Sequence, residues 1–148
     1  MSQPQNLAHP RKIFINLPVR DLEASKEFFG KLGFFFNPMF TDQNAACLIL
    51  NDEAFVMLLV ESRFKDFTSK AICDTRTHVE GLFAITCDSR AEVDALYAAA
   101  IDAGATGDGA LIDYGFMVQR NIFDLDGHHW ELFYMDISAF PGQGDAPA

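Results

Sequence analysis

Apolar residues in the first half of this chain fall into short runs that turn residues separate. Residues 12–18 predict a strand, and Asp21 is a plausible N-cap for a helix over residues 22–32. Three further strands are predicted at residues 34–40, 45–50 and 54–60. The order of these elements is β-α-β-β-β.

The same order returns in the second half, after a charged connector. Residues 81–87 predict a strand, and Ser89 precedes a predicted helix over residues 90–103. A weak strand is expected within residues 105–112, and clearer strands at residues 116–123 and 128–135.

The two halves therefore form a diverged repeat. When Val19 is placed over Cys87, a spacing of 68 residues, Asp21 falls over Ser89. The fold class is predicted to be α+β, with a first βαβββ unit at residues 12–60 and a second at residues 81–135. A connector at residues 61–80 joins them, and a loose leader (residues 1–11) and a loose tail (residues 136–148) flank them.

The last two strands enclose Asp124-Leu125-Asp126-Gly127, which predicts a tight turn with glycine at its end. Glu131 lies in the following strand among aromatic and aliphatic residues, where a charge needs a metal, a donor, a cation or water. With a bulge at the turn, Glu131 faces Asn121. A register shifted by one residue would bring Arg120 opposite instead, and we favour Asn121.

Composition limits the partners and the compartment that we expect for this protein. The 148 residues are 49% apolar, with 15 Phe, so a large core is available. A net charge of −10 argues against nucleic acid or an anionic membrane surface as partner. No apolar run is long enough to span a bilayer, and no secretory signal is seen. The three cysteines are widely spaced and favour a reduced, cytoplasmic protein.

Four motifs, in this order and spacing, resemble the vicinal oxygen chelate superfamily, which comprises glyoxalase I, bleomycin-resistance proteins and extradiol dioxygenases. They are Asn16-Leu-Pro-Val-Arg-Asp-Leu22, Ser25-x-x-Phe28-Phe29, Leu32-Gly33-Phe34 and Asp124-Leu-Asp126-Gly127-x-x-x-Glu131. The chain looks most like small bacterial proteins labelled as predicted lactoylglutathione lyases. The resemblance implies that the two units form a curved, cup-like mixed sheet with helices outside, and that the protein is a homodimer.

Metal-dependent members of this superfamily carry ligands on the first and last strands of each unit. Carried over by position, the four ligands fall on Phe14, near Leu58, on Leu82 and on Glu131. Only Glu131 can bind a divalent ion, and a catalytic site needs about three protein ligands. We therefore predict no metal site and no cofactor. His129 and Glu131 could supply two ligands from one face, and a divalent metal held in an unconventional way is the alternative.

The resemblance also implies a pocket inside the cup. Asn16, Gln119, Asn121 and Glu131 would be its polar groups, with Glu131 a candidate catalytic residue, and its apolar lining would comprise Phe14, Leu58, Leu82, Met117 and Phe133. Tyr114 could close the pocket or cover the end of the barrel. Glu131 could equally be held by an amide or by water, and Asn16 could bond a neighbouring loop.

Three functions follow as hypotheses. The first is a metal-independent member of the superfamily that binds a small organic molecule. The second is a metal-dependent lyase or isomerase resembling glyoxalase I, with Glu131 as base or ligand. The third is a dimeric protein with no ligand, whose cup is filled by its own side chains.

Overall fold

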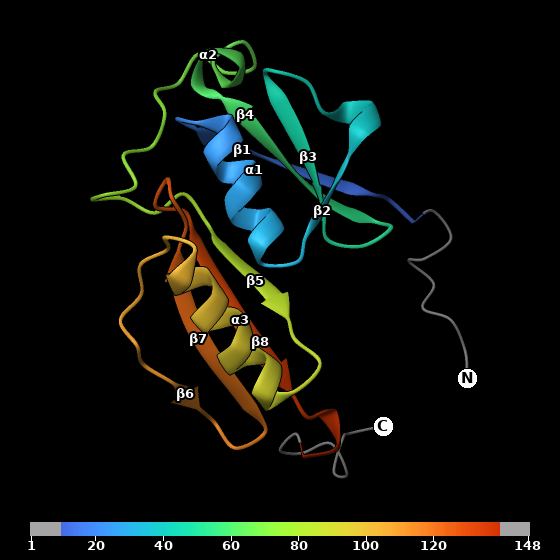
Figure 1. Ribbon diagram of the computed structural model, residues 1–148, viewed down its shortest axis with the longest axis vertical. Helices are drawn as coiled ribbons and strands as arrows, with labels where there is room; N and C mark the ends of the chain where they lie inside the picture. The colour runs from blue at the N-terminus through green and yellow to red at the C-terminus, as the bar shows by residue number, and fades with distance from the viewer. Residues whose placement is uncertain (1–9, 140–148) are drawn as a thin grey trace, which may run out of the picture. The chain divides into compact units, whose positions relative to one another are not determined.

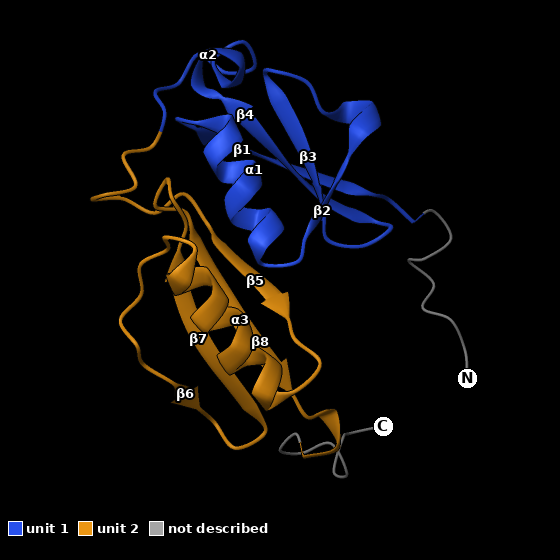
Figure 2. Ribbon diagram, in the orientation of Figure 1, with its two compact units in different colours: residues 1–72 blue, residues 73–148 orange. Residues whose placement is uncertain are grey.

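The computed structural model describes residues 10–139 and divides into two compact units, residues 1–72 and residues 73–148 (Figure 2). The division falls inside the predicted connector. Most of the predicted leader and tail lies outside the described residues.

Unit 1 contains a four-stranded mixed sheet and one main helix (Figure 1). Its elements are β1 (Ile13–Val19), α1 (Leu22–Lys31), β2 (Phe35–Asn37), a 3-10 helix η2 (Pro38–Phe40), β3 (Ala45–Ile49), β4 (Ala54–Val60) and the short α2 (Glu61–Phe64). The strand order is β1-β4-β3-β2, in which β1 and β4 are parallel and the other pairs are antiparallel.

Unit 2 repeats this arrangement with longer connections. Its elements are β5 (Leu82–Thr86), α3 (Arg90–Asp102), β6 (Ile112–Asp113), β7 (Met117–Phe123), β8 (His129–Met135) and the 3-10 helix η3 (Ile137–Ala139). The strand order is β5-β8-β7-β6, again with one parallel pair, β5 with β8. The predicted α+β class with two βαβββ units is confirmed, and each unit has a four-stranded sheet of its own.

Both main helices begin where their caps place them. The Asp21 carboxylate accepts a hydrogen bond from the Ala24 amide at 3.0 Å, and the Ser89 hydroxyl accepts one from the Glu92 amide at 3.0 Å. Glu92 in turn accepts from the Asp88 amide at 2.7 Å. These bonds satisfy amide groups that have no partner inside the helix, which is why sequence reasoning located both helix starts.

Each helix covers one face of its own sheet. In unit 2, the Arg120 side chain reaches α3, where Nε lies 2.7 Å from Asp94 and the guanidinium stacks over the Tyr97 ring. The covered faces hold the core of each unit, and the opposite face of each sheet, called here the open face, is more accessible. Side chains less than 2% exposed on the covered faces include Val19, Leu48, Val56, Leu58, Val118, Ile122 and Leu132.

Two strand predictions differ from the structure. Residues 34–40 form a strand only at β2, because Pro38 opens η2 and the Asn37 side chain accepts the Met39 amide at 3.0 Å. The weak strand expected within residues 105–112 is reduced to one bridge, Thr106 to Phe123, before β6 begins. Within residues 10–139, no helix is both long enough and apolar enough to cross a bilayer.

Candidate functional site

The open face of the unit 2 sheet brings most of the predicted site together. Strands β7 and β8 pair so that Asn121 lies directly opposite Glu131, which confirms the favoured register. Arg120 instead lies opposite Leu132, on the face that α3 covers. On its other side, Glu131 is paired with Ala84 of β5, whose side chain is a single methyl group.

Four polar side chains of β7 and β8 lie on this face. The Gln119 amide nitrogen donates to the Asn121 side-chain oxygen at 2.9 Å. Nε2 of His129 lies 4.0 Å from Oε2 of Glu131, and these two side chains are 19% and 21% exposed. Nε2 of His129 is buried, with no hydrogen-bond partner among the described residues. The His129 ring is held edge-on against Phe123, with ring centres 4.8 Å apart.

The other predicted residues of unit 2 surround this polar set. Leu82 pairs with His129, and Phe133 pairs with Gln119, so both share the open face. Met117 begins β7 on the same face. Tyr114 is 60% exposed in the turn before β7, where its amide donates to the Met117 carbonyl at 2.8 Å.

The remaining predicted residues belong to unit 1. The Phe14 ring stacks on Phe55 with centres 4.7 Å apart, on the open face of that sheet. Asn16 shares this face, and its amide donates to the Phe14 carbonyl at 3.2 Å rather than to a neighbouring loop. Leu58 was predicted to line the pocket, and this is wrong. It pairs with Leu17 and is fully buried on the opposite face, because side chains alternate along a strand.

The pairing also corrects the position that corresponds to Glu131 in unit 1. Phe14 pairs with Phe55 as Leu82 pairs with His129, so the residue two further along, Met57, corresponds to Glu131. The four ligand positions implied by the superfamily are therefore Phe14, Met57, Leu82 and Glu131. They supply one carboxylate, and no group of three His, Cys, Asp or Glu suited to a metal occurs within residues 10–139. This donor set does not fit a catalytic divalent ion.

Sequence reasoning missed a second polar cluster, which organises the turn between β7 and β8. One oxygen of Asp124 accepts the Asp126 amide at 2.9 Å and the His128 amide at 3.0 Å, and the other accepts Nε1 of Trp130 at 2.9 Å. Burial raises the pKa of the Asp124 carboxyl, while His128 and the N–H donors oppose that rise. The turn motif was recognised, but not that its first carboxylate would be buried.

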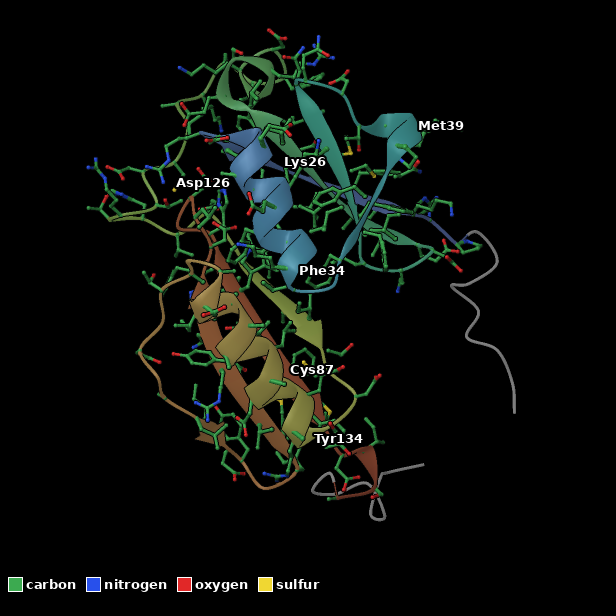
Figure 3. The ribbon with its side chains drawn as sticks, in the orientation of Figure 1. Lys26, Phe34, Met39, Cys87, Asp126 and Tyr134 are labelled. Atoms are coloured by element: carbon green, nitrogen blue, oxygen red, sulfur yellow. The ribbon has the colours of Figure 1, made fainter. Side chains whose placement is uncertain are left out.

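His128, the residue that follows the turn glycine, is buried beside this cluster. It is 1% exposed, and Nδ1 contacts the Glu80 carboxylate at 2.5 Å. Glu80 belongs to an N-terminal arm of unit 2, residues 73–80, which is also bound to the turn by the Thr75 hydroxyl donating to the Asp126 carbonyl. Figure 3 labels Asp126 at this turn. Contacts separated by about fifty residues in sequence have no local signal.

The cysteines allow a direct test of burial. Cys47 and Cys87 are buried and Cys73 is partly buried, all as free thiols. Burial raises the pKa of the Cys87 thiol to about 11, and the thiolate is the reactive form. We expect iodoacetamide at pH 8 to leave Cys87 unlabelled in the native protein and to label it fully in denaturant, as peptide mass mapping would show. Equal rates in both states would contradict this burial.

Comparison with known proteins agrees with the fold. Residues 11–51 match a family model described as the bleomycin resistance protein-like N-terminal domain. No curated protein matches the chain.

Solved structures extend the likeness over both units. A hypothetical protein from S. aureus is 24% identical, with a TM-score of 0.73, over 83% of this chain and 92% of that one. A glyoxalase-related enzyme from Fulvimarina pelagi is 20% identical, with a TM-score of 0.73, over 86% and 89%. A lactoylglutathione lyase from Agrobacterium tumefaciens is 16% identical, with a TM-score of 0.61, over 86% and 96%. The N-terminal match and the shared fold support the vicinal oxygen chelate superfamily, which the motifs predicted.

Proposed function

We propose that this protein binds a small organic molecule on the open face of unit 2, without a divalent metal. The observation that carries the proposal is the half-buried polar set of Gln119, Asn121, His129 and Glu131 on β7 and β8, whose other open-face side chains are apolar. A few convergent polar groups among apolar side chains are the usual composition of a small-molecule site.

The apolar neighbours favour an aromatic ligand. Phe133 and Met117 lie beside the polar set on β8 and β7, and Leu82 flanks it on β5. Aromatic and thioether side chains make favourable contacts with a flat ring. The net charge of −10 argues against nucleic acid and anionic membranes as partners.

Amide NMR of the full chain, titrated with 2-naphthol, tests this proposal. We expect shift changes concentrated in β7 and β8, and about fivefold weaker binding in Phe133→Ala, since one aromatic contact is lost. Phe67→Ala removes a phenylalanine from unit 1 that is 65% exposed, and serves as the matched control. Undetectable binding, or shifts scattered away from the open face, would contradict the proposal.

Elemental analysis for bound metal distinguishes metal-independent binding from the rival function, a metal-dependent lyase or isomerase. We expect far less than one zinc, nickel or manganese per chain, before and after a challenge with zinc and nickel, because three of the four ligand positions are Phe14, Met57 and Leu82. One metal per chain would favour a lyase or isomerase resembling glyoxalase I, with Glu131 as ligand or base.

We also infer a cytoplasmic homodimer. The three free cysteines favour a reducing compartment. Phe35 of unit 1 is 78% exposed, as suits a residue that a second copy covers. Light scattering that gives the mass of one chain would contradict the dimer. A stable dimer with no bound probe would favour the third hypothesis, a dimeric protein without a ligand.

A further inference from the structure

The distance between Nε2 of His129 and Oε2 of Glu131 suits an atom that bridges them. At 4.0 Å, Nε2 and Oε2 are too far apart for a direct hydrogen bond. A single oxygen atom about 2.8 Å from each would subtend an angle of about 90° between them, which a hydroxyl group accommodates. The gap therefore has the dimensions of one bridging oxygen.

The two atoms also differ in their hydrogen-bonding roles. Glu131 carries a carboxylate, which only accepts hydrogen bonds, while an imidazole nitrogen that carries a proton donates one. Nε2 of His129 is buried and has no partner in the described part of the chain, and leaving such a group unpaired is costly. One group that both donates and accepts would satisfy the pair.

We propose that His129 and Glu131 together recognise a hydroxyl group on the ligand. The hydroxyl donates its proton to the Glu131 carboxylate and accepts the N–H of His129 at Nε2. This inference rests on the proposed function and narrows it to hydroxylated aromatic compounds, whose ring lies against Phe133 and Met117. His129, for which sequence reasoning considered only a metal, thereby becomes a specificity residue.

Other ligand groups fit the pair less well. A carboxylate would be repelled by Glu131, and a methyl ether has no proton to donate. An ammonium group can donate to Glu131 but cannot accept from His129. The His129 ring packs edge-on against Phe123, which favours the orientation that keeps Nε2 beside the carboxylate.

The geometry is supported from the neighbouring strand. Asn121 faces Glu131 across the β7–β8 pair, and its side-chain oxygen is occupied by the Gln119 amide at 2.9 Å. The Asn121 amide nitrogen is thereby directed away from Gln119, as a donor on the same face. A ligand with a second oxygen atom would gain a second contact there.

Three naphthalene derivatives that differ in one substituent test whether the site prefers a ligand hydroxyl group. The affinities of 2-naphthol, 2-methoxynaphthalene and naphthalene-2-carboxylate for the full chain are measured by amide NMR titration at pH 7. We expect 2-naphthol to bind at least about tenfold more tightly than the other two, since it alone makes both hydrogen bonds. If 2-methoxynaphthalene binds equally well at the same residues, the hydroxyl inference is overturned while the proposed binding function stands. If no probe binds, both are overturned.

Variants assign the preference to the two residues. Glu131→Leu should bring the affinities of 2-naphthol and 2-methoxynaphthalene within about twofold of each other, because it removes the acceptor that only the hydroxyl can use. His129→Phe should weaken 2-naphthol binding by about fivefold and keep part of the preference, because the bond to Glu131 remains. Glu23→Gln, an exposed change in α1, should keep the full preference. Preserved amide spectra of the free variants show that they are folded. A tenfold preference that survives in Glu131→Leu, or an unchanged affinity of His129→Phe for 2-naphthol, would overturn the assignment.

The imidazole nitrogen gives an independent readout. In long-range proton–nitrogen spectra of the unmodified protein, the Nε2 signal of His129 should move with 2-naphthol and stay in place with 2-methoxynaphthalene. Equal movement with both probes would overturn the inference, since ring proximity alone would then account for it.

Discussion

Replacing Asp124 with alanine is expected to lower the free energy of unfolding of unit 2 by about 3 kcal/mol. The carboxylate accepts three hydrogen bonds, two from the turn backbone and one from the Trp130 indole. Removing it leaves buried N–H groups without a partner, and bonds to a charged acceptor are the stronger kind. Asp124→Asn should cost about 2 kcal/mol, because its NH₂ group would face one of the former donors.

Urea unfolding followed by tryptophan fluorescence measures this effect in the correct unit. Trp130 is the single tryptophan of the chain, is 2% exposed and bonds Asp124 directly. The loss of stability in Asp21→Ala serves as the reference for the loss at Asp124. This substitution removes an exposed helix cap in unit 1 and should cost about 1 kcal/mol, measured by circular dichroism. A loss at Asp124 no larger than that at Asp21 would show that the buried cluster is not the anchor of the turn.

Gly127→Ala is expected to have the second largest effect, a loss of about 2 to 3 kcal/mol. Gly127 has a φ of +81°, where an alanine is strained by about 1 kcal/mol. A Cβ there would also lie 2.4 Å from the Thr75 hydroxyl oxygen, so the arm must move and its bond to the Asp126 carbonyl is lost. Sequence reasoning assigned the glycine to the turn, but the collision comes from a segment about fifty residues earlier.

Variants at two other glycines distinguish the cost of backbone strain from the cost of a steric collision. Gly115 has a φ of +84° with open space around its Cβ position, so Gly115→Ala should cost only about 1 kcal/mol. Gly30 lies in α1 with open space, and Gly30→Ala should stabilise unit 1 by about 0.5 kcal/mol, because alanine favours the helix. The same denaturant titrations measure all three variants. If Gly127→Ala and Gly115→Ala lower the free energy of unfolding equally, then residues 73–80 move away from the new methyl group without loss of stability.

The sequence by itself determined the elements and their repetition. Caps at Asp21 and Ser89, glycine at the end of the β7–β8 turn and period-two apolar runs are local signals, so the two βαβββ units followed from them. The pairing of Asn121 with Glu131 followed as well, because turn geometry sets the register of a hairpin.

Only the tertiary structure decided which side chains share a surface. Leu58 proved to be core and Met57 its replacement on the open face, because strand β4 pairs with β1 in a register that no nearby turn dictates. His128 is buried because Glu80, forty-eight residues away, reaches it. The His129–Glu131 spacing likewise depends on packing against Phe123. Such contacts join residues whose proximity arises only when the chain has folded, so local patterns carry no record of them.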